Sequence, residues 1–292
     1  MTTLLVANRG EIARRIFRTA KRMGMNTVAV YSDADVSLPF VREADVAVRL
    51  GPAPASASYL DVERILAAAA ETSADLVHPG YGFLAESPRL ASAVAKRGLR
   101  FVGPPPEVLA SLGDKAKAKD LARLAGVPIL PGFSGDDKRD ESFIEAARRV
   151  GYPVMVKPVE GGGGIGIQRV REESGLRDAL AKARRVSAAS FGDERLLLER
   201  LVERPRHIEV QILADTHGNV IALGERDCST QRRHQKVLEE TPAPSLDDKQ
   251  RKTIADAAVA LARQAGYVNA GTVEFAVDEH DAFFFLEVNA RL

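Results

Sequence analysis

The chain has 292 residues, of which 45% are hydrophobic and 28% charged, and its formal net charge is +1. This length suits about two domains with a substantial buried core, and the balanced charge argues against a nucleic-acid or membrane partner attracted by bulk charge. A single cysteine, Cys228, excludes an internal disulfide and indicates a reducing compartment; with no apolar run of membrane-spanning length and no targeting segment, we expect a cytoplasmic protein.

Residues 1–113 alternate strand and helix patterns. The predicted strands are short apolar runs at 4–7, 27–31, 75–77 and 100–103. Because apolar residues recur at helical spacing between them, the pattern predicts a parallel sheet covered by helices, as in a Rossmann-like domain. The turn at 8–10 lacks the glycine pattern of a dinucleotide site, which argues against a nicotinamide cofactor.

The segment 78–84 places polar and aromatic groups directly after one of these strands. Open α/β sheets usually bind ligands at this end of their strands. The alternative is a rigid loop built by glycine and proline, and for His78 alone we favour that alternative.

The second domain is expected over residues 114–292. The glycine and prolines at 103–106 interrupt the pattern of strands and helices, and we place the domain boundary just after them, near Gly113. A helix then opens at Asp114; its lysines are expected to form a solvated face, although Lys115 could turn inward. A small αβ module at about 132–203 would make a mobile lid.

The lid contains Lys157 followed by four successive glycines at 161–164, between two apolar runs. Successive glycines can turn a row of N–H groups toward one ligand, and a lysine supplies the charge that phosphate binders often need. The run is neither a Walker A motif nor a dinucleotide fingerprint. It therefore predicts another kind of hairpin that closes over a polyphosphate, with a flexible linker as the alternative.

After the lid, alternation with a period of two predicts a hairpin with strands at 206–212 and 220–223. The cation-rich run 225–236 is expected to be irregular and to line a cleft, with solvated surface as the alternative. A helix and two strands complete the chain, at 247–265, 271–277 and 282–289.

Three polar side chains of the last strand, Glu287, Asn289 and Arg291, are spaced by two and project from one face. Glu274 lies on the preceding strand and reaches the same surface if the register allows. Two carboxylates and an amide oxygen suit Mg²⁺ bound together with phosphates. Either glutamate alone would be assigned to the wet face of a sheet, but their coincidence with the glycine loop favours ATP with Mg²⁺.

Together these motifs resemble the biotin carboxylase component of biotin-dependent carboxylases, members of the ATP-grasp superfamily. The resemblance spans essentially the whole chain, and the segments that carry it are 6–12, 78–83, 113–115, the lysine and glycine loop, 205–207, 225–236 and 287–291. It implies a Rossmann-like N-terminal domain followed by an ATP-grasp domain with a small mobile lid.

The resemblance also implies roles for individual residues. ATP would be bound by Lys115 and Lys157 at the phosphates, Gly163 and Gly164 above them, Glu199, Arg200, Leu201 and Val202 at the adenine, and His207, Gln231 and His234 beside them. Glu274, Glu287 and Asn289 would bind Mg²⁺ or Mn²⁺ next to the nucleotide, and Lys236 and Arg291 would orient bicarbonate.

The activity that the resemblance implies begins with phosphorylation of bicarbonate by ATP. The carboxyphosphate then passes its carboxyl group to biotin on a carrier protein, and clustered cations would stabilise the charge that develops. A carboxyltransferase subunit is the further implied partner, the full-length form would be a homo-oligomer, and acetyl-, propionyl- and methylcrotonyl-CoA and pyruvate all remain open as final acceptors.

Two departures from the family pattern shape the expected activity. The family continues beyond Arg291 with a catalytic glutamate and a further subdomain, so we expect this chain to bind ATP·Mg²⁺ with little or no biotin carboxylation. Ile165 stands where the family has Lys or Arg, and Glu160, where it has a small neutral residue, would add repulsion near phosphate; one lost charge-assisted contact corresponds to about 1.5–3 kcal/mol. A non-catalytic nucleotide-binding relative and another ATP-grasp ligase remain alternatives.

Overall fold

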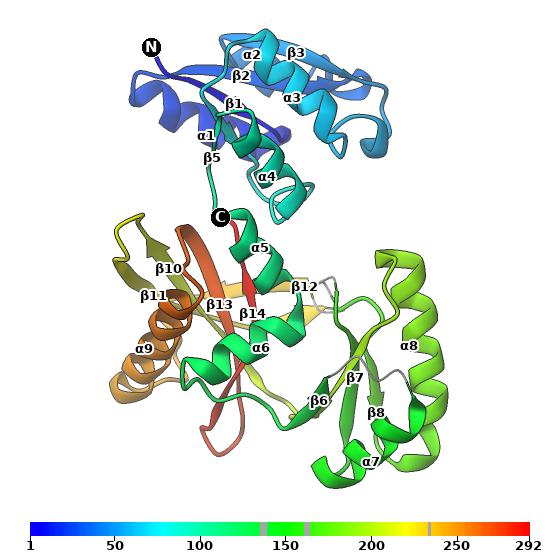
Figure 1. The fold of residues 1–292 in the computed structure, drawn as a ribbon. Helices are drawn as coiled ribbons and strands as arrows, with labels where there is room; N and C mark the ends of the chain where they lie inside the picture. Colours follow the sequence, from blue (N-terminus) through cyan, green and yellow to red (C-terminus); the bar gives the residue numbers. More distant parts are fainter. Residues whose placement is uncertain (135–138, 161–163, 233–234) are drawn as a thin grey trace.

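The structure is a computed structural model that describes residues 1–134, 139–160, 164–232 and 235–292. The predicted site residues Gly163 and His234 lie outside the described residues. Within the described ranges, no helix is both long enough and apolar enough to cross a membrane. The chain builds three sheets, A, B and C, and Figure 1 shows sheet A at the top and sheet C at the lower right.

Sheet A is parallel, in the order β3-β2-β1-β4-β5. Its strands are β1 (Thr3–Val6), β2 (Asn26–Ser32), β3 (Val46–Gly51), β4 (Leu76–His78) and β5 (Arg100–Phe101), and its helices are α1 (Gly10–Arg22), α2 (Pro39–Glu43), α3 (Val62–Glu71) and α4 (Pro88–Lys96). Along β1, Leu5 enters the core with α3 and α4 while Leu4 and Val6 enter the core with α1 and α2, so helices cover both faces. Strand β3 was not predicted, although four of its six residues are apolar; in this edge strand Val46, Ala47 and Arg49 are exposed.

The loops that follow β1 and β4 meet at the carboxyl edge of sheet A. Asn8 Nδ2 donates hydrogen bonds to the carbonyl oxygens of Pro79 and Tyr81, both at 2.7 Å. His78 Nδ1 accepts from the Gly80 N–H at 3.0 Å, and burial lowers the pKa of His78 to about 4, so the ring is neutral at physiological pH. These contacts fit the interpretation of His78 as part of a rigid loop, which stays a prediction.

Sheet B is antiparallel, in the order β12-β11-β10-β13-β14. Its strands are β10 (Arg206–Ala214), β11 (Val220–Arg232), β12 (Gln235–Glu240), β13 (Asn269–Val277) and β14 (Phe283–Asn289), and α5 (Pro106–Gly113), α6 (Lys115–Leu124) and α9 (Asp248–Gln264) share its core. The expectation of an irregular segment at 225–236 is wrong for its described residues, because 225–232 belong to β11 and 235–236 begin β12. Two register shifts between Asp227 and Gln231 interrupt the alternation that would have revealed the strands.

Sheet C forms the predicted lid, with the strand order β6-β9-β7-β8. Its elements are β6 (Gly132–Ser134), α7 (Asp140–Val150), β7 (Val154–Pro158), β8 (Gln168–Val170), α8 (Leu176–Phe191) and β9 (Leu196–Arg200). Phe143, Leu180 and Leu198 belong to a hydrophobic core that lies entirely within these elements. The lid thus has its own core, as its predicted movement would require, and that movement stays a prediction.

Alanine substitutions at two glycines test how closely the loop after β4 is packed. Gly80 and Gly82 have nearly the same φ, +64° and +65°. A Cβ at Gly80 would lie 2.9 Å from Asn8 Nδ2, whereas a Cβ at Gly82 would meet nothing within 4 Å. Both Gly80→Ala and Gly82→Ala should lose about 1 kcal/mol through positive φ, and G80A should lose about 1–3 kcal/mol more through the clash. Equal losses in urea unfolding would contradict this packing.

Candidate functional site

A cleft of about 900 Å³ lies between sheet B and the lid. Its floor is the face of sheet B that is turned away from the core. Strand β10 sends Ile208 and Val210 into the core and His207 and Glu209 into the cleft, because side chains alternate along a strand. The same alternation in β13 sends Glu274 into the cleft, so the floor is polar where the other face is apolar.

The three predicted metal ligands lie together on this floor. Glu274 of β13 stands directly opposite Glu287 of β14, and Asn289 follows Glu287 on the same face of its strand. The amide Nδ2 of Asn289 donates to Glu274 Oε1 at 2.6 Å. The register therefore brings the trio to one surface, as the sequence required, and their role as metal ligands stays a prediction.

The two facing carboxylates have opposite electrostatic environments. Burial opposes the charge of Glu274, but the hydrogen bond to His207 and the charge of Lys236 outweigh it and lower the pKa of Glu274 to about 2. Burial and the nearby charge of Glu274 raise the pKa of Glu287. Like charges opposite each other in a β-ladder are destabilising, so a cation placed at Glu287 would relieve the repulsion.

His207 and Lys236 contact Glu274, and Gln231 contacts His207; the roles predicted for the three residues stay predictions. His207 Nε2 lies 2.7 Å from Glu274 Oε2, and His207 Nδ1 lies 2.9 Å from Gln231 Nε2. Lys236 Nζ donates to Glu274 Oε1 at 2.8 Å, and this pair raises the pKa of Lys236 against the effect of burial. The ammonium group therefore stays charged while it lines the cleft.

Glu209 belongs to this floor, although sequence reasoning missed it. Its buried carboxylate accepts from both Lys236 and Arg226. The available signal was the alternation of 206–212, which places Glu209 on the same face as His207.

A second group of charges lies on the lid side of the cleft. Lys157 Nζ of β7 lies 2.5 Å from Glu199 Oε2 of β9, and the other oxygen of Glu199 pairs with Lys119 of α6. Burial, with the charge of Lys115 adding to it, lowers the pKa of Lys157 to about 8. The expectation that the lysines of α6 other than Lys115 are solvated is wrong for Lys119, which is buried because its partner comes from a distant strand.

Helix α6 starts at the edge of the cleft. The Asp114 side chain caps the helix by accepting from the N–H groups of Ala116 and Lys117, at 3.0 and 3.1 Å. The N–H of Lys115 donates to the Val159 carbonyl at 3.2 Å, which ties the helix start to the lid. The other predicted nucleotide-binding positions of the described chain also line the cleft, namely Lys115, Gly164, Glu199, Arg200, Leu201 and Val202.

Arg291 lines the same cleft near the end of the described chain. Its Nε lies 3.9 Å from Glu86 Oε1, and the same oxygen accepts from the Ala290 N–H at 3.0 Å. Glu86 comes from the N-terminal region and was not singled out from the sequence. It joins that region to the end of sheet B, beside the predicted bicarbonate position.

The two departures in the glycine loop differ in their structural setting. Glu160, which was expected only to repel phosphate, lies 3.4 Å from the guanidinium of Arg195, which also contacts Asp114 at 3.2 Å. Burial and the charge of Asp114 raise the pKa of Glu160, and Arg195 partly offsets them. Ile165 lines the cleft with 49% of its surface exposed, so this position presents an apolar side chain where a cation was expected.

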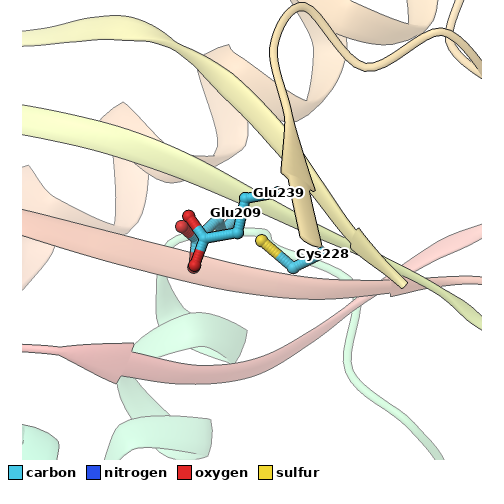
Figure 2. Close-up of side chains that lie close together, drawn as sticks. All are labelled: Glu209, Cys228 and Glu239. Carbon is cyan, nitrogen blue, oxygen red and sulfur yellow. The ribbon is translucent and has the colours of Figure 1, made fainter. Parts of the chain in front are cut away.

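One further cluster contains side chains that bind metals in other proteins. Figure 2 shows Cys228 beside the carboxylates of Glu209 and Glu239, with their potential ligand atoms within 4.8 Å of one another. Glu209 is already neutralised by Lys236 and Arg226. Burial raises the pKa of Cys228 to about 12, so its thiol stays protonated. These contacts indicate an ion-pair network and not a second metal site.

Two family descriptions together match almost the whole chain. The biotin carboxylase N-terminal domain matches residues 1–109, and the ATP-binding domain of the carbamoyl-phosphate synthase L chain matches residues 114–292. The chain belongs to the biotin carboxylase family. The resemblance seen in the sequence is thereby confirmed, and so is the predicted fold of a Rossmann-like domain followed by an ATP-grasp domain.

Two relatives align with this chain over part of their own length. The chain is 52% identical to the mitochondrial methylcrotonoyl-CoA carboxylase subunit alpha of Arabidopsis thaliana over 99% of the chain and 40% of the relative. It is 48% identical to biotin carboxylase 2 of Bacillus subtilis over 100% of the chain and 66% of the relative. The chain thus spans between 40% and 66% of the length of these two relatives.

Solved structures of biotin carboxylases superpose closely on this fold. The Campylobacter jejuni biotin carboxylase, solved as a β,γ-ATP complex, is 44% identical with a TM-score of 0.97, covering 100% of this chain and 65% of that one. The biotin carboxylase domain of Hydrogenobacter thermophilus 2-oxoglutarate carboxylase, solved with MgADP and bicarbonate, is 43% identical with a TM-score of 0.96, covering 100% and 64%.

Removing the charge of Glu274 and removing the charge of Glu287 should change the free energy of unfolding in opposite directions. The buffer contains a chelator, so that no metal occupies the site. The pKa of Glu274 is lowered by folding, so its charge stabilises the fold above pH about 4.5, and Glu274→Gln should destabilise the protein at pH 7 by about 1–3 kcal/mol. The pKa of Glu287 is raised, so its charge destabilises the fold at pH 7, and Glu287→Gln should stabilise it by about 1 kcal/mol.

Both differences should shrink as the pH falls. That of E287Q should disappear as the pH falls through the raised pKa of the folded state toward about 4.5, and that of E274Q between about 4.5 and about 2. Urea unfolding of the two variants at several pH values measures them. Changes in the free energy of unfolding that have the same sign for both variants at pH 7 would contradict the opposite environments of Glu274 and Glu287.

Proposed function

We propose that this chain binds MgATP in the cleft between sheet B and the lid. The observation that carries the proposal is that Lys157, on the lid, faces the same space as Glu274 and Glu287 on the floor. A nucleotide with its metal has the complementary charges, because its phosphates suit the lysine and its cation suits the carboxylates. Arg200, Leu201 and Val202 line the cleft at the lid hinge and would meet the adenine.

The residues present fit a divalent cation. Glu274, Glu287 and Asn289 offer carboxylate and amide oxygens on one face of sheet B, which is the donor set that Mg²⁺ or Mn²⁺ prefers. Bound there, the metal would supply charge neutralisation between phosphate oxygens. It would also remove the repulsion that raises the pKa of Glu287.

We further infer that the protein phosphorylates bicarbonate and passes the carboxyl group to biotin. Lys236 and Arg291 line the cleft with positive charge and would orient bicarbonate and stabilise carboxyphosphate as charge develops. The relatives support this assignment, since they include a biotin carboxylase and the alpha subunit of an acyl-CoA carboxylase. A biotin carrier and a carboxyltransferase subunit would be the partners of the complete enzyme, and its full-length form would be a homo-oligomer.

A non-catalytic nucleotide-binding relative is the second candidate, and one observation favours it. The exposed side chain of Ile165 replaces a cation at the mouth of the cleft, which would weaken the hold on the phosphates. ADP release that depends on bicarbonate and biotin distinguishes the two candidates. Release that depends on both substrates supports the carboxylase, whereas nucleotide binding without such release supports the non-catalytic relative.

Nucleotide binding tests the primary proposal. Titration calorimetry with MgATP should show one site, and Lys157→Met should weaken binding by about ten- to a hundred-fold, the value of one charge-assisted contact. Lys182→Met, which removes an exposed lysine from α8 of the same lid, should change nothing. The proposal fails if the wild-type protein does not bind MgATP or if both variants bind alike.

The pH dependence of ATP binding should reveal Lys157. Its pKa of about 8 means that the free protein loses the ammonium charge as the pH rises through 8. ATP affinity should therefore fall above pH 8, by up to about tenfold per pH unit. Lys157→Arg keeps its charge in this range and should bind ATP with a flatter profile. An unchanged wild-type affinity at pH 9.5 would show that Lys157 does not hold phosphate.

A further inference from the structure

The first turns of α6 are joined to the lid at three points. Asp114 Oδ2 accepts from Arg195 at 3.2 Å, and the Lys115 N–H donates to the Val159 carbonyl at 3.2 Å. One turn further along the helix, Lys119 forms an ion pair with Glu199 of β9. This third contact is the buried one, since the side chains of Lys119 and Glu199 are only 8% and 3% exposed.

Glu199 divides its carboxylate between two lysines. Lys119 takes Oε1, while Lys157 Nζ lies 2.5 Å from Oε2. One negative charge therefore faces two positive charges, and Lys157 is the more accessible of the two at 14% exposure. An ammonium group has three donors, so Lys157 can keep one contact with Glu199 and still donate into the cleft.

We propose that Lys119 is a positioning residue for nucleotide binding. By holding Oε1 of Glu199, Lys119 prevents that carboxylate from enclosing Lys157 and leaves the Lys157 ammonium available to the phosphates of a bound nucleotide. Without Lys119, the buried carboxylate has Lys157 as its remaining lysine partner and turns its second oxygen toward the same ammonium group, because a buried charge needs its counter-charge. Lys119 itself contacts Glu199 and acts through it.

A positioning role for Lys119 and a purely structural role predict different effects on ligand binding. If Lys119 only stabilises the fold, its loss should lower the unfolding temperature and affect every ligand of the cleft alike. If it positions Lys157, its loss should weaken the binding of ligands that carry β- and γ-phosphates more than the binding of ligands that lack them. AMP lacks the β- and γ-phosphates, so its binding should change little while ATP binding falls.

The test uses Lys119→Met in the full chain, with Lys117→Met as the matched control. Lys117 lies on the same helix but is exposed. Calorimetric titration with MgATP should give about tenfold weaker binding for K119M. AMP binding should change less than about twofold, and K117M should match the wild type for both ligands. If K119M does not fold, Lys119→Gln replaces it with the same expectations.

A second substitution tests the route through Glu199. In Lys119→Met combined with Glu199→Gln, Lys157 is no longer held by a carboxylate, so ATP affinity should recover most of the loss. Equal weakening of ATP and AMP, unchanged ATP binding in K119M, or absence of recovery in the double variant would each overturn the inference. The inference rests on the proposed function; if the wild-type protein does not bind MgATP, both fail, whereas normal ATP binding by K119M rejects the positioning role alone.

Discussion

The direct opposition of Glu274 and Glu287 across the β13–β14 ladder determines the character of the cleft. Two carboxylates in facing positions repel each other, and burial strengthens that repulsion. The protein neutralises only one of them, since His207 and Lys236 both converge on Glu274. Glu287 remains in an environment that opposes its charge, which is a destabilising arrangement unless a cation binds there.

The lid presents the opposite imbalance. Lys119 and Lys157 share the single carboxylate of Glu199, so this wall of the cleft carries surplus positive charge. Burial lowers the pKa of Lys157, which shows that this charge too is held at a cost in free energy. The charge of Glu287 on the floor and the positive charge of the lid fit a ligand that carries both a cation and phosphates. The same ligand would join the two walls, which gives a physical reason for a lid with its own hydrophobic core to close.

Local sequence patterns predicted much of this arrangement. The period of two in the last strand placed Glu287 and Asn289 on one face, and the alternating strands and helices predicted sheet A. Features that depend on a distant partner were missed. Lys119 has the sequence setting of a solvated helix lysine, and only the fold brings Glu199 to it. The strands at 225–232 and 235–236 were missed because their register shifts break the alternation.

A crystal structure of this chain with MgADP tests the central claim most directly. We expect the metal at about 2.1 Å from a carboxylate oxygen of Glu287, with Glu274 and Asn289 beside it and the diphosphate turned toward Lys157. A nucleotide bound elsewhere, or a metal that contacts neither glutamate, would contradict it.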